Sequence, residues 1–267
     1  MFFLGYCGGV LLLVFFLFGL IIGSFLNVCI YRIPQNQSIA FPASRCSHCK
    51  TPLAVRDLIP VVSYLFLKGR CRYCHHSISK RYPLVELLTA FLFVLCYMIT
   101  GYHFESLGLI LFTSFLLVIT FIDIDHHLIF DKVLTWFALM GIAFNALHTY
   151  ENLSGILPLL SFLDMLTGVL IGGGSFLAIA LISKGGMGGG DIKLAAALGL
   201  WLGWKLNLLA LFLAFLFGGI GSGTLLALKI KGRKDPIPFG PFISAGAFIS
   251  MLYGSVIIDW YLQVLNR

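Results

Sequence analysis

The stretch Gly185–Lys193, GGMGGGDIK, lies between two long apolar segments and closes a run of glycines with one carboxylate. A charged side chain at the edge of the hydrocarbon layer is costly, and it usually marks a functional site that faces a bundle interior or water. The residues from Ile192 onward favour a helix, so we expect Asp191 near a helix N-terminus. A simple helix cap is the alternative for Asp191, but a cap needs no six-residue glycine-rich lead-in.

The composition on both sides of this stretch indicates a membrane protein. The chain is 59% hydrophobic and only 11% charged, and its mean hydropathy is +0.98. A soluble domain typically carries about 25% charged residues. We therefore expect an all-α polytopic membrane protein. Its first apolar run, Gly8–Tyr31, is too long for a signal-peptide core and lacks a basic flank before it, so it is predicted to be a retained transmembrane helix.

Further apolar segments predict the remaining membrane helices. They lie at Leu84–Thr100, Leu107–Ile122, Val133–His148, Met165–Ser183, Ile192–Gly203, Leu206–Leu228 and Phe242–Leu262. The segment Ile192–Gly203 is shorter than the roughly 17–25 residues that cross a bilayer. It must be tilted, re-entrant or shielded by neighbours, so seven and eight transmembrane helices both stay open. The Gly172–Gly174 triplet within a span predicts a close helix crossing.

Half of the basic residues lie in one connection between the first two spans. Nine of the eighteen Lys and Arg residues lie there, against a single acidic residue, Asp57. The nine are Arg32, Arg45, Lys50, Arg56, Lys68, Arg70, Arg72, Lys80 and Arg81. The positive-inside rule therefore places this loop in the cytoplasm and the N-terminus outside. Because the charge is concentrated in a membrane-flanking loop, the net charge of +7 indicates contact with a lipid bilayer and no nucleic-acid partner.

The same loop carries two C-x2-C pairs, Cys46/Cys49 and Cys71/Cys74. Two such pairs supply the four thiolates of a closed, tetrahedral structural Zn²⁺ site. Disulfides are disfavoured in the cytoplasm, which favours a metal over bridges. A redox pair or unpaired thiols remain alternatives, and His48, His75 and His76 are nearby substitutes as ligands. The sequence thus predicts a small zinc-binding cytoplasmic loop.

A second acidic stretch, FIDIDHHLIFD at Phe121–Asp131, ends a predicted span on the cytoplasmic side. Asp123 directly follows an apolar helix, whereas Asp125 would point to the opposite side of a continuing helix. By the predicted topology, Asp123 and Asp191 end at the same membrane face. Two neighbouring carboxylates share a proton, so that one acts as a general base on water and the other as a general acid.

Other interpretations of this acidic stretch stay open. Asp123, Asp125, His126 and His127 contain donors for a divalent metal, and solvated residues of a turn or an ion pathway are further alternatives. Against a transporter, the chain has no inverted repeat of broken helices. Ser183 and Lys184 do not suggest a Ser–Lys protease, because adjacent helical residues do not face each other.

These motifs together resemble the type IV prepilin peptidases, bacterial inner-membrane aspartyl proteases with a GxGD signature. Gly188–Asp191 matches that signature, and Ile122, Asp123 and Asp131 match the family's I-D-x6-P-D pattern, with Phe130 where proline is usual. The resemblance covers nearly the whole chain. Its other parts are the opening GSFLNV…YRIP segment from Gly23 to Pro34, the two C-x2-C pairs, SKRYPLVE at Ser79–Glu86 and PIPFGPF at Pro236–Phe242.

The resemblance implies an endopeptidase with Asp123 and Asp191 as catalytic residues. It would remove a basic leader from prepilins or pseudopilins after a glycine, at the cytoplasmic face of the inner membrane, with a periplasmic N-terminus. It also implies N-methylation of the new N-terminus with S-adenosylmethionine. Glu86 is a candidate for that site or for substrate positioning, and pairing with the loop's arginines is its alternative.

The functional division that follows assigns residues 1–83, with the first helix and the zinc loop, to methyl transfer or substrate contact, and residues 84–267 to the peptidase bundle. A non-catalytic, zinc-bearing assembly or transport component is the alternative function. No oligomeric state and no particular prepilin follow from the sequence.

Overall fold

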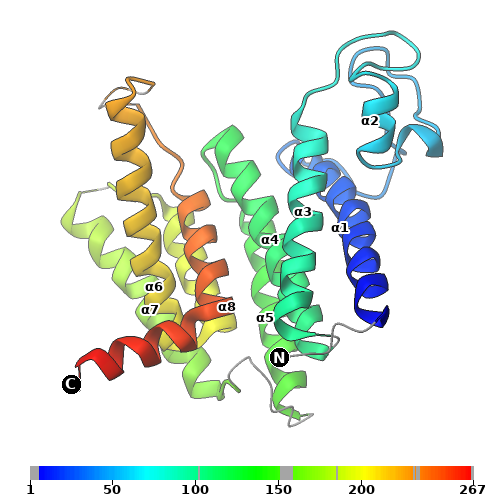
Figure 1. The fold of residues 1–267 in the computed structure, drawn as a ribbon. Coiled ribbons are helices and arrows are strands. Elements are labelled where there is room, and N and C mark those ends of the chain that lie inside the picture. Colours follow the sequence, from blue (N-terminus) through cyan, green and yellow to red (C-terminus); the bar gives the residue numbers. More distant parts are fainter. Residues whose placement is uncertain are drawn as a thin grey trace. The chain divides into compact units, whose positions relative to one another are not determined.

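The structure, a computed structural model, describes residues 6–101, 103–150, 159–184, 186–230, 232 and 235–265, with side chains from residue 9 onward (Figure 1). These residues are helical apart from turns, loops and two isolated β-bridges. The chain divides into two compact units, Met1–Tyr102 and His103–Arg267. The functional division after Pro83 concerns activities rather than packing and stays a prediction.

The first unit is built on two packed helices, α1 (Tyr6–Arg32) and α3 (Arg81–Thr100). Small residues allow their backbones to approach closely, as is usual between membrane helices. A Cβ atom on Gly19 would lie 2.5 Å from Cα of Ala90, and one on Gly23 would lie 2.7 Å from Cα of Glu86. The crossing therefore depends on glycine at both positions.

The cysteine loop, residues 33–80, connects these two helices. It contains the short helices η1 (Val55–Asp57) and α2 (Val62–Phe66). Its start is fixed by Arg32, whose guanidinium donates to the carbonyls of Ser38 and Pro42 at 2.9 and 2.8 Å. Two isolated bridges, Arg45–Pro52 and Arg70–Ser77, each close a small turn around one C-x2-C pair. The loop is therefore made of two similar turns with η1 and α2 between them.

The second unit holds five helices, α4 (Phe104–His126), α5 (Asp131–Tyr150), α6 (Phe162–Ile182), α7 (Gly189–Ala227) and α8 (Gly240–Leu265). Its interior contains an aromatic cluster: the Trp201 ring stacks on those of Phe137 and Phe144 and lies tilted against that of Phe112. The indole N–H of Trp201 also donates to the Phe137 carbonyl at 2.8 Å. The ring contacts and this bond together join α4, α5 and α7 in one core.

The 39-residue helix α7 consists of two arms that turn back on each other at Gly203, where φ is 64° and ψ is −176°. Glycine adopts this left-handed φ without strain. The side-chain amide of Asn207 donates to the carbonyls of Ala195 in the other arm and Gly168 in α6, both at 3.0 Å. Residues twelve positions apart would be about 18 Å apart in a straight helix, so the arms lie side by side.

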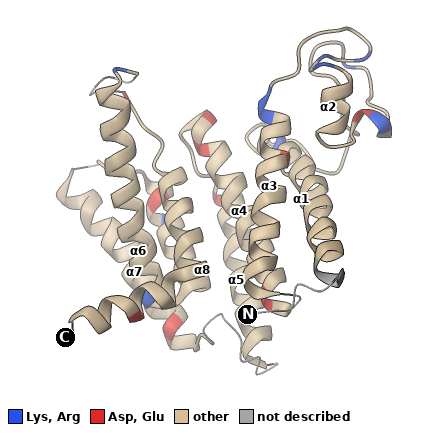
Figure 2. Cartoon of the chain, viewed as in Figure 1, with Lys and Arg blue, Asp and Glu red and all other residues tan. Residues whose placement is uncertain are grey.

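Seven helices of the described chain are long and apolar enough to cross a membrane, α1 and α3 to α8. This confirms the all-α polytopic class. The open count of seven or eight is explained by α7, which contains both the short segment Ile192–Gly203 and the segment that follows it. The short arm is shielded: Leu194, Ala195, Leu198 and Leu202 are at most 1% exposed. Charged residues gather at helix ends and in connections, leaving long uncharged stretches between them (Figure 2).

The predicted close crossing at the glycine triplet of α6 is also present. A Cβ atom on Gly172 would collide with the Ala195 carbonyl oxygen and the Asn207 amide of α7. One on Gly173 would lie 3.0 Å from Cβ of Ala196. Gly172 and Gly173 therefore pack against α7, whereas a Cβ atom on Gly174 would meet nothing within 4 Å.

Candidate active site and metal centre

Asp123 lies in the last turn of α4 and is only 5% exposed. Its Oδ2 atom accepts a hydrogen bond of 2.8 Å from the backbone N–H of Gly240, the first residue of α8. A side chain at this position would displace the carboxylate, because a Cβ atom on Gly240 would lie 2.7 Å from that oxygen. The start of α8 therefore fixes the Asp123 carboxylate from one side.

Asp191 lies in the first turn of α7, as the sequence predicted. Its carboxylate accepts a hydrogen bond from the backbone N–H of Gly188, the N-cap residue of that helix. Asp191 is therefore not the N-cap residue itself; it is the third residue of α7 and bonds back to the N-cap N–H. This bond is not its only contact, since the carboxylate is also close enough to that of Asp123 for their charges to interact.

Two contacts bring the start of α7 to the turn between α4 and α5. A Cβ atom on Gly190 would lie 2.9 Å from Cβ of Ile129, so this glycine of the GxGD motif permits close packing of the turn. Lys193 donates to both carboxylate oxygens of Asp131, at 2.7 and 2.8 Å. The motif residues Asp123, Asp131 and Asp191 are thus collected at one end of the second unit.

The other acid and the histidines of this stretch are arranged differently. Asp125, His126 and His127 are exposed, and the backbone N–H of His127 closes the helix by donating to the Asp123 carbonyl at 2.8 Å. Across the described residues, the groups close enough to share a metal ion are the four loop cysteines, and none lies in this acidic stretch. The opposite orientations of Asp123 and Asp125 agree with the helical spacing.

The four cysteines of the loop form a compact cluster in the first unit. The sulfur atoms of Cys46, Cys49, Cys71 and Cys74 all lie within 4.8 Å of one another, and those of Cys46 and Cys74 are 3.8 Å apart. A zinc ion with Zn–S bonds of about 2.3 Å places the sulfur atoms of a regular tetrahedron about 3.8 Å apart. The donor set therefore fits one zinc ion. His48 and His76 stack on each other instead, with ring centroids 4.3 Å apart.

The thiols of this cluster differ in acidity. The hydroxyl and the backbone N–H of Thr51 lower the pKa of Cys49 to about 6. The backbone N–H of His76 acts in the same direction on Cys74, but burial and hydrogen bonds with the other cysteines outweigh it and raise the pKa of Cys74 to about 11. Because the thiolate is the form that binds metal, a bound ion would have to displace the proton of Cys74.

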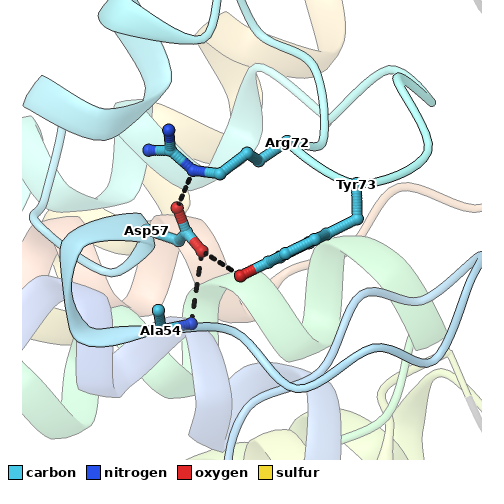
Figure 3. A network of polar contacts seen from close by, with 4 residues as sticks. All are labelled: Ala54, Asp57, Arg72 and Tyr73. Atoms are coloured by element: carbon cyan, nitrogen blue, oxygen red, sulfur yellow. Dashed lines mark hydrogen bonds and ion pairs between the residues drawn. The ribbon is translucent and has the colours of Figure 1, made fainter.

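Asp57 connects η1 to the second C-x2-C turn (Figure 3). Its carboxylate accepts hydrogen bonds from Nε of Arg72 at 2.6 Å, the Tyr73 hydroxyl at 3.1 Å and the backbone N–H of Ala54 at 3.2 Å. Arg72 and Tyr73 are the two residues between Cys71 and Cys74. The one acid of the loop therefore fixes the position of a metal-binding turn.

Glu86 is 7% exposed on α3 and has two partners within the first unit. Its Oε2 atom accepts a hydrogen bond of 2.8 Å from the backbone N–H of Val61, and its carboxylate is also bonded to Ser24 of α1. Val61 adopts a φ of 59°, which is unusual and costly for a β-branched residue. The Glu86 carboxylate therefore holds a strained part of the cysteine loop against the helix pair.

Three contacts of the site were not predicted. The sequence places Gly240 within PIPFGPF and predicts no role for Lys193 or Asp57. The proline-flanked glycine before the last apolar segment was the only signal for Gly240. Lys193 follows Asp191 by two residues, but its partner lies 62 residues away, a distance that no local pattern indicates.

The fold and these sites define a multi-pass helical membrane protein with a pair of motif aspartates at a helix-bundle end and a four-cysteine centre in a separate loop. Two family models match it. The bacterial peptidase A24 N-terminal domain matches residues 17–100, and the type IV leader peptidase family matches residues 110–223. The chain belongs to the type IV leader peptidase family.

Its relatives resemble it over nearly their whole length. The prepilin leader peptidase/N-methyltransferase of Aeromonas salmonicida is 37% identical over 94% of this chain and 93% of its own. Proteins of the same name from Bacillus subtilis and Pseudomonas aeruginosa are 38% and 33% identical, over 95% and 92% of this chain and 99% and 92% of their own. No solved structure matches significantly.

Proposed function

We propose that this protein is a membrane-embedded aspartyl endopeptidase that removes the basic leader of type IV prepilins or pseudopilins after a glycine. The active site would lie at the cytoplasmic face of a bacterial inner membrane, with the N-terminus in the periplasm. The observation that carries the proposal is that Asp123 of α4 and Asp191 of α7 lie close enough, at one end of the second unit, for their charges to interact. The names of the relatives support the substrate class.

The proposed reaction uses the two carboxylates as an acid and a base. The ionised carboxylate takes a proton from a water molecule as the water oxygen attacks the leader's scissile carbonyl carbon. The protonated carboxyl gives its proton to the carbonyl oxygen, and the tetrahedral intermediate then collapses with protonation of the leaving amine. Gly240 and Gly188 would each fix one carboxylate oxygen, which leaves the other oxygen of each aspartate for this chemistry.

The four cysteines would hold a structural zinc ion and keep the loop folded, so that the loop can help to hold or select the substrate. The peptidase step itself needs no metal. Chelation is therefore expected to affect cleavage only through the fold of the loop. Loss of cleavage while the loop stays ordered would instead favour metal-dependent chemistry.

N-methylation of the new N-terminus is the second proposed activity, on the basis of the family and the relatives' names. S-adenosylmethionine would supply the methyl group. Glu86 is the candidate residue, but its buried carboxylate is committed to Val61 and Ser24. This arrangement does not present a free carboxylate to a cofactor.

The direct test is cleavage of a prepilin-like peptide by the purified, detergent-solubilised protein. Wild type is compared with Asp123→Asn and Asp191→Asn, and Asp125→Asn serves as the matched control because that acid is exposed. We expect both buried-site variants to lose cleavage while the control retains it. If a variant of Asp123 or Asp191 folds and still cuts at the wild-type rate, that aspartate is not catalytic. Absence of cleavage by the folded wild-type protein would favour a non-catalytic assembly component.

A further inference from the structure

A groove of about 520 Å³ lies within the first unit, at the start of α3. It is lined by Tyr64 of α2 and by Lys80, Pro83, Leu84, Leu87 and Leu88. The α3 residues recur at spacings of three and four, so they share one face of that helix. The Tyr64 hydroxyl donates to the Ile78 carbonyl at 3.4 Å. This bond holds the tyrosine in place as one wall of the groove.

The groove changes from charged to apolar along α3. Lys80 is exposed at the N-cap of the helix, and α3 is long and apolar enough to cross a membrane from Arg81 onward. Leu84 and Leu88, 53% and 37% exposed, lie one and two turns further in. Lys80 therefore stands at the level of the membrane surface and the leucines within the hydrocarbon layer. A matching ligand has an anionic end and an apolar body in the same order.

The charge of the surrounding loop favours an anionic partner over a neutral one. Nine basic residues flank or lie within the loop, against the single acid Asp57. The Asp57 carboxylate is already paired with Arg72, Tyr73 and the Ala54 N–H. Basic residues clustered next to a membrane helix attract anionic lipid headgroups.

We propose that this groove binds one anionic phospholipid. Its phosphate would lie at Lys80, and one acyl chain would lie along Leu84, Leu87 and Leu88 beside Tyr64. Because Tyr64 belongs to the cysteine loop and the leucines to α3, the bound lipid would hold the loop at the start of its membrane helix. The lipid would thus be a structural ligand of the first unit, independent of the chemistry of the aspartates.

The test is native mass spectrometry of the full-length, zinc-loaded protein, titrated with phosphatidylglycerol or with phosphatidylcholine of the same acyl chains. We expect the first phosphatidylglycerol to bind at least about five-fold more tightly than the first phosphatidylcholine, as one lysine at a membrane surface predicts. Lys80→Ala should reduce this preference to less than two-fold. The control Lys68→Ala removes an exposed lysine from the same loop outside the groove, and it should leave the preference unchanged.

A second pair of measurements tests the apolar part of the groove. Leu84→Ser should weaken the first binding event of both lipids, and glycerophosphoglycerol, the headgroup without acyl chains, should not displace phosphatidylglycerol. The proposal is overturned by equal binding of the two lipids to wild type, or by equal effects of the two lysine substitutions. Displacement by the free headgroup or by an apolar substrate peptide would overturn it too, the latter by identifying a peptide site.

Discussion

The backbone N–H of Gly240 donates a hydrogen bond of 2.8 Å to Oδ2 of Asp123, 117 residues away in the sequence. Asp191 has a corresponding contact with the N–H of Gly188. In both cases the donor is a glycine at the start of a helix, where backbone N–H groups lack partners within the helix and favour negative charge. Each aspartate therefore has one carboxylate oxygen held by a backbone N–H group. Substitutions of side chains elsewhere should change the position of that group little.

This arrangement predicts graded effects of adding a methyl group at the two glycines. A Cβ atom would lie 2.7 Å from the carboxylate oxygen at Gly240, but 3.1 Å at Gly188. Gly240→Ala must shift the Asp123 carboxylate, and cleavage should fall about 100-fold, as expected when the proposed catalytic carboxylate is displaced. Gly188→Ala should lower the rate of cleavage by a smaller factor. Steady-state cleavage of a prepilin-like peptide measures both.

The matched control for this series is Gly219→Ala, because a Cβ atom on Gly219 of α7 would meet nothing within 4 Å. Its activity should equal that of wild type. If Gly240→Ala folds normally and cleaves as fast as the control, the Gly240 N–H does not position Asp123 for the reaction.

The ion pair between Lys193 and Asp131 predicts a rescue by charge reversal. Both side chains are more than half exposed, so the pair should contribute less than about 1 kcal/mol to the free energy of unfolding. Its expected effect is on geometry, since it connects the start of α7 to the start of α5. Lys193→Glu should therefore lower cleavage several-fold with little change in thermal stability.

Lys193→Glu combined with Asp131→Lys should restore most of that activity, because the pair is re-formed with opposite polarity. Recovery of kcat in the double variant is the measurement that matters. An additive loss in the double variant would mean that the two residues act separately and that the pair does not align the two helices.

Much of the fold can be predicted from the sequence because membrane helices have simple sequence features. Long apolar segments predict the transmembrane helices, and the distribution of Lys and Arg identifies the one strongly basic loop between them. Helical spacing predicts that Asp123 and Asp125 point to opposite sides of α4, and the structure has the first buried and the second exposed. The C-x2-C spacing likewise predicted four thiols that come within 4.8 Å of one another.

Contacts between distant segments were the part that the sequence did not indicate. The reversal of α7 depends on one φ angle at Gly203 and on the amide of Asn207, whereas the sequence pattern left the short segment tilted, re-entrant or shielded. The hydrogen bonds from Gly240 to Asp123 and from Val61 to Glu86 also depend on how distant segments pack together. A single sequence carries no periodic signal for such pairs.

The hydrogen bonds to the Asp57 carboxylate predict that substitution of this residue weakens zinc retention by the loop. Burial tends to raise the pKa of this carboxyl, but hydrogen bonds from Arg72, the Ala54 N–H and Tyr73 outweigh it and lower the pKa below its usual value. A lowered folded-state pKa means that the stabilisation is present above the unfolded value of about 3.9 and is lost as the pH falls through the folded value. At neutral pH the contact is therefore fully formed.

Asp57→Asn removes the charge but keeps the size of the side chain. Because charge-assisted hydrogen bonds are roughly twice as strong as neutral ones, zinc release to a coloured chelator at pH 7 should become several-fold faster. Asp235→Asn, which changes an exposed acid of the second unit, should release zinc at the wild-type rate. Equal rates for all three proteins would show that Asp57 does not stabilise the metal-binding turn.

The crossing of α6 and α7 predicts the largest loss of stability. A Cβ atom on Gly199 would overlap with the backbone of Gly168 and Val169, and overpacking of this kind typically costs about 1–3 kcal/mol. Gly199→Ala should therefore lower the thermal unfolding temperature in detergent. Gly223→Ala on the same helix, where a Cβ atom meets nothing within 4 Å, should leave it unchanged or raise it, because alanine favours helix over glycine. Equal unfolding temperatures for the two variants would contradict the close crossing that places Asp191 at the bundle end.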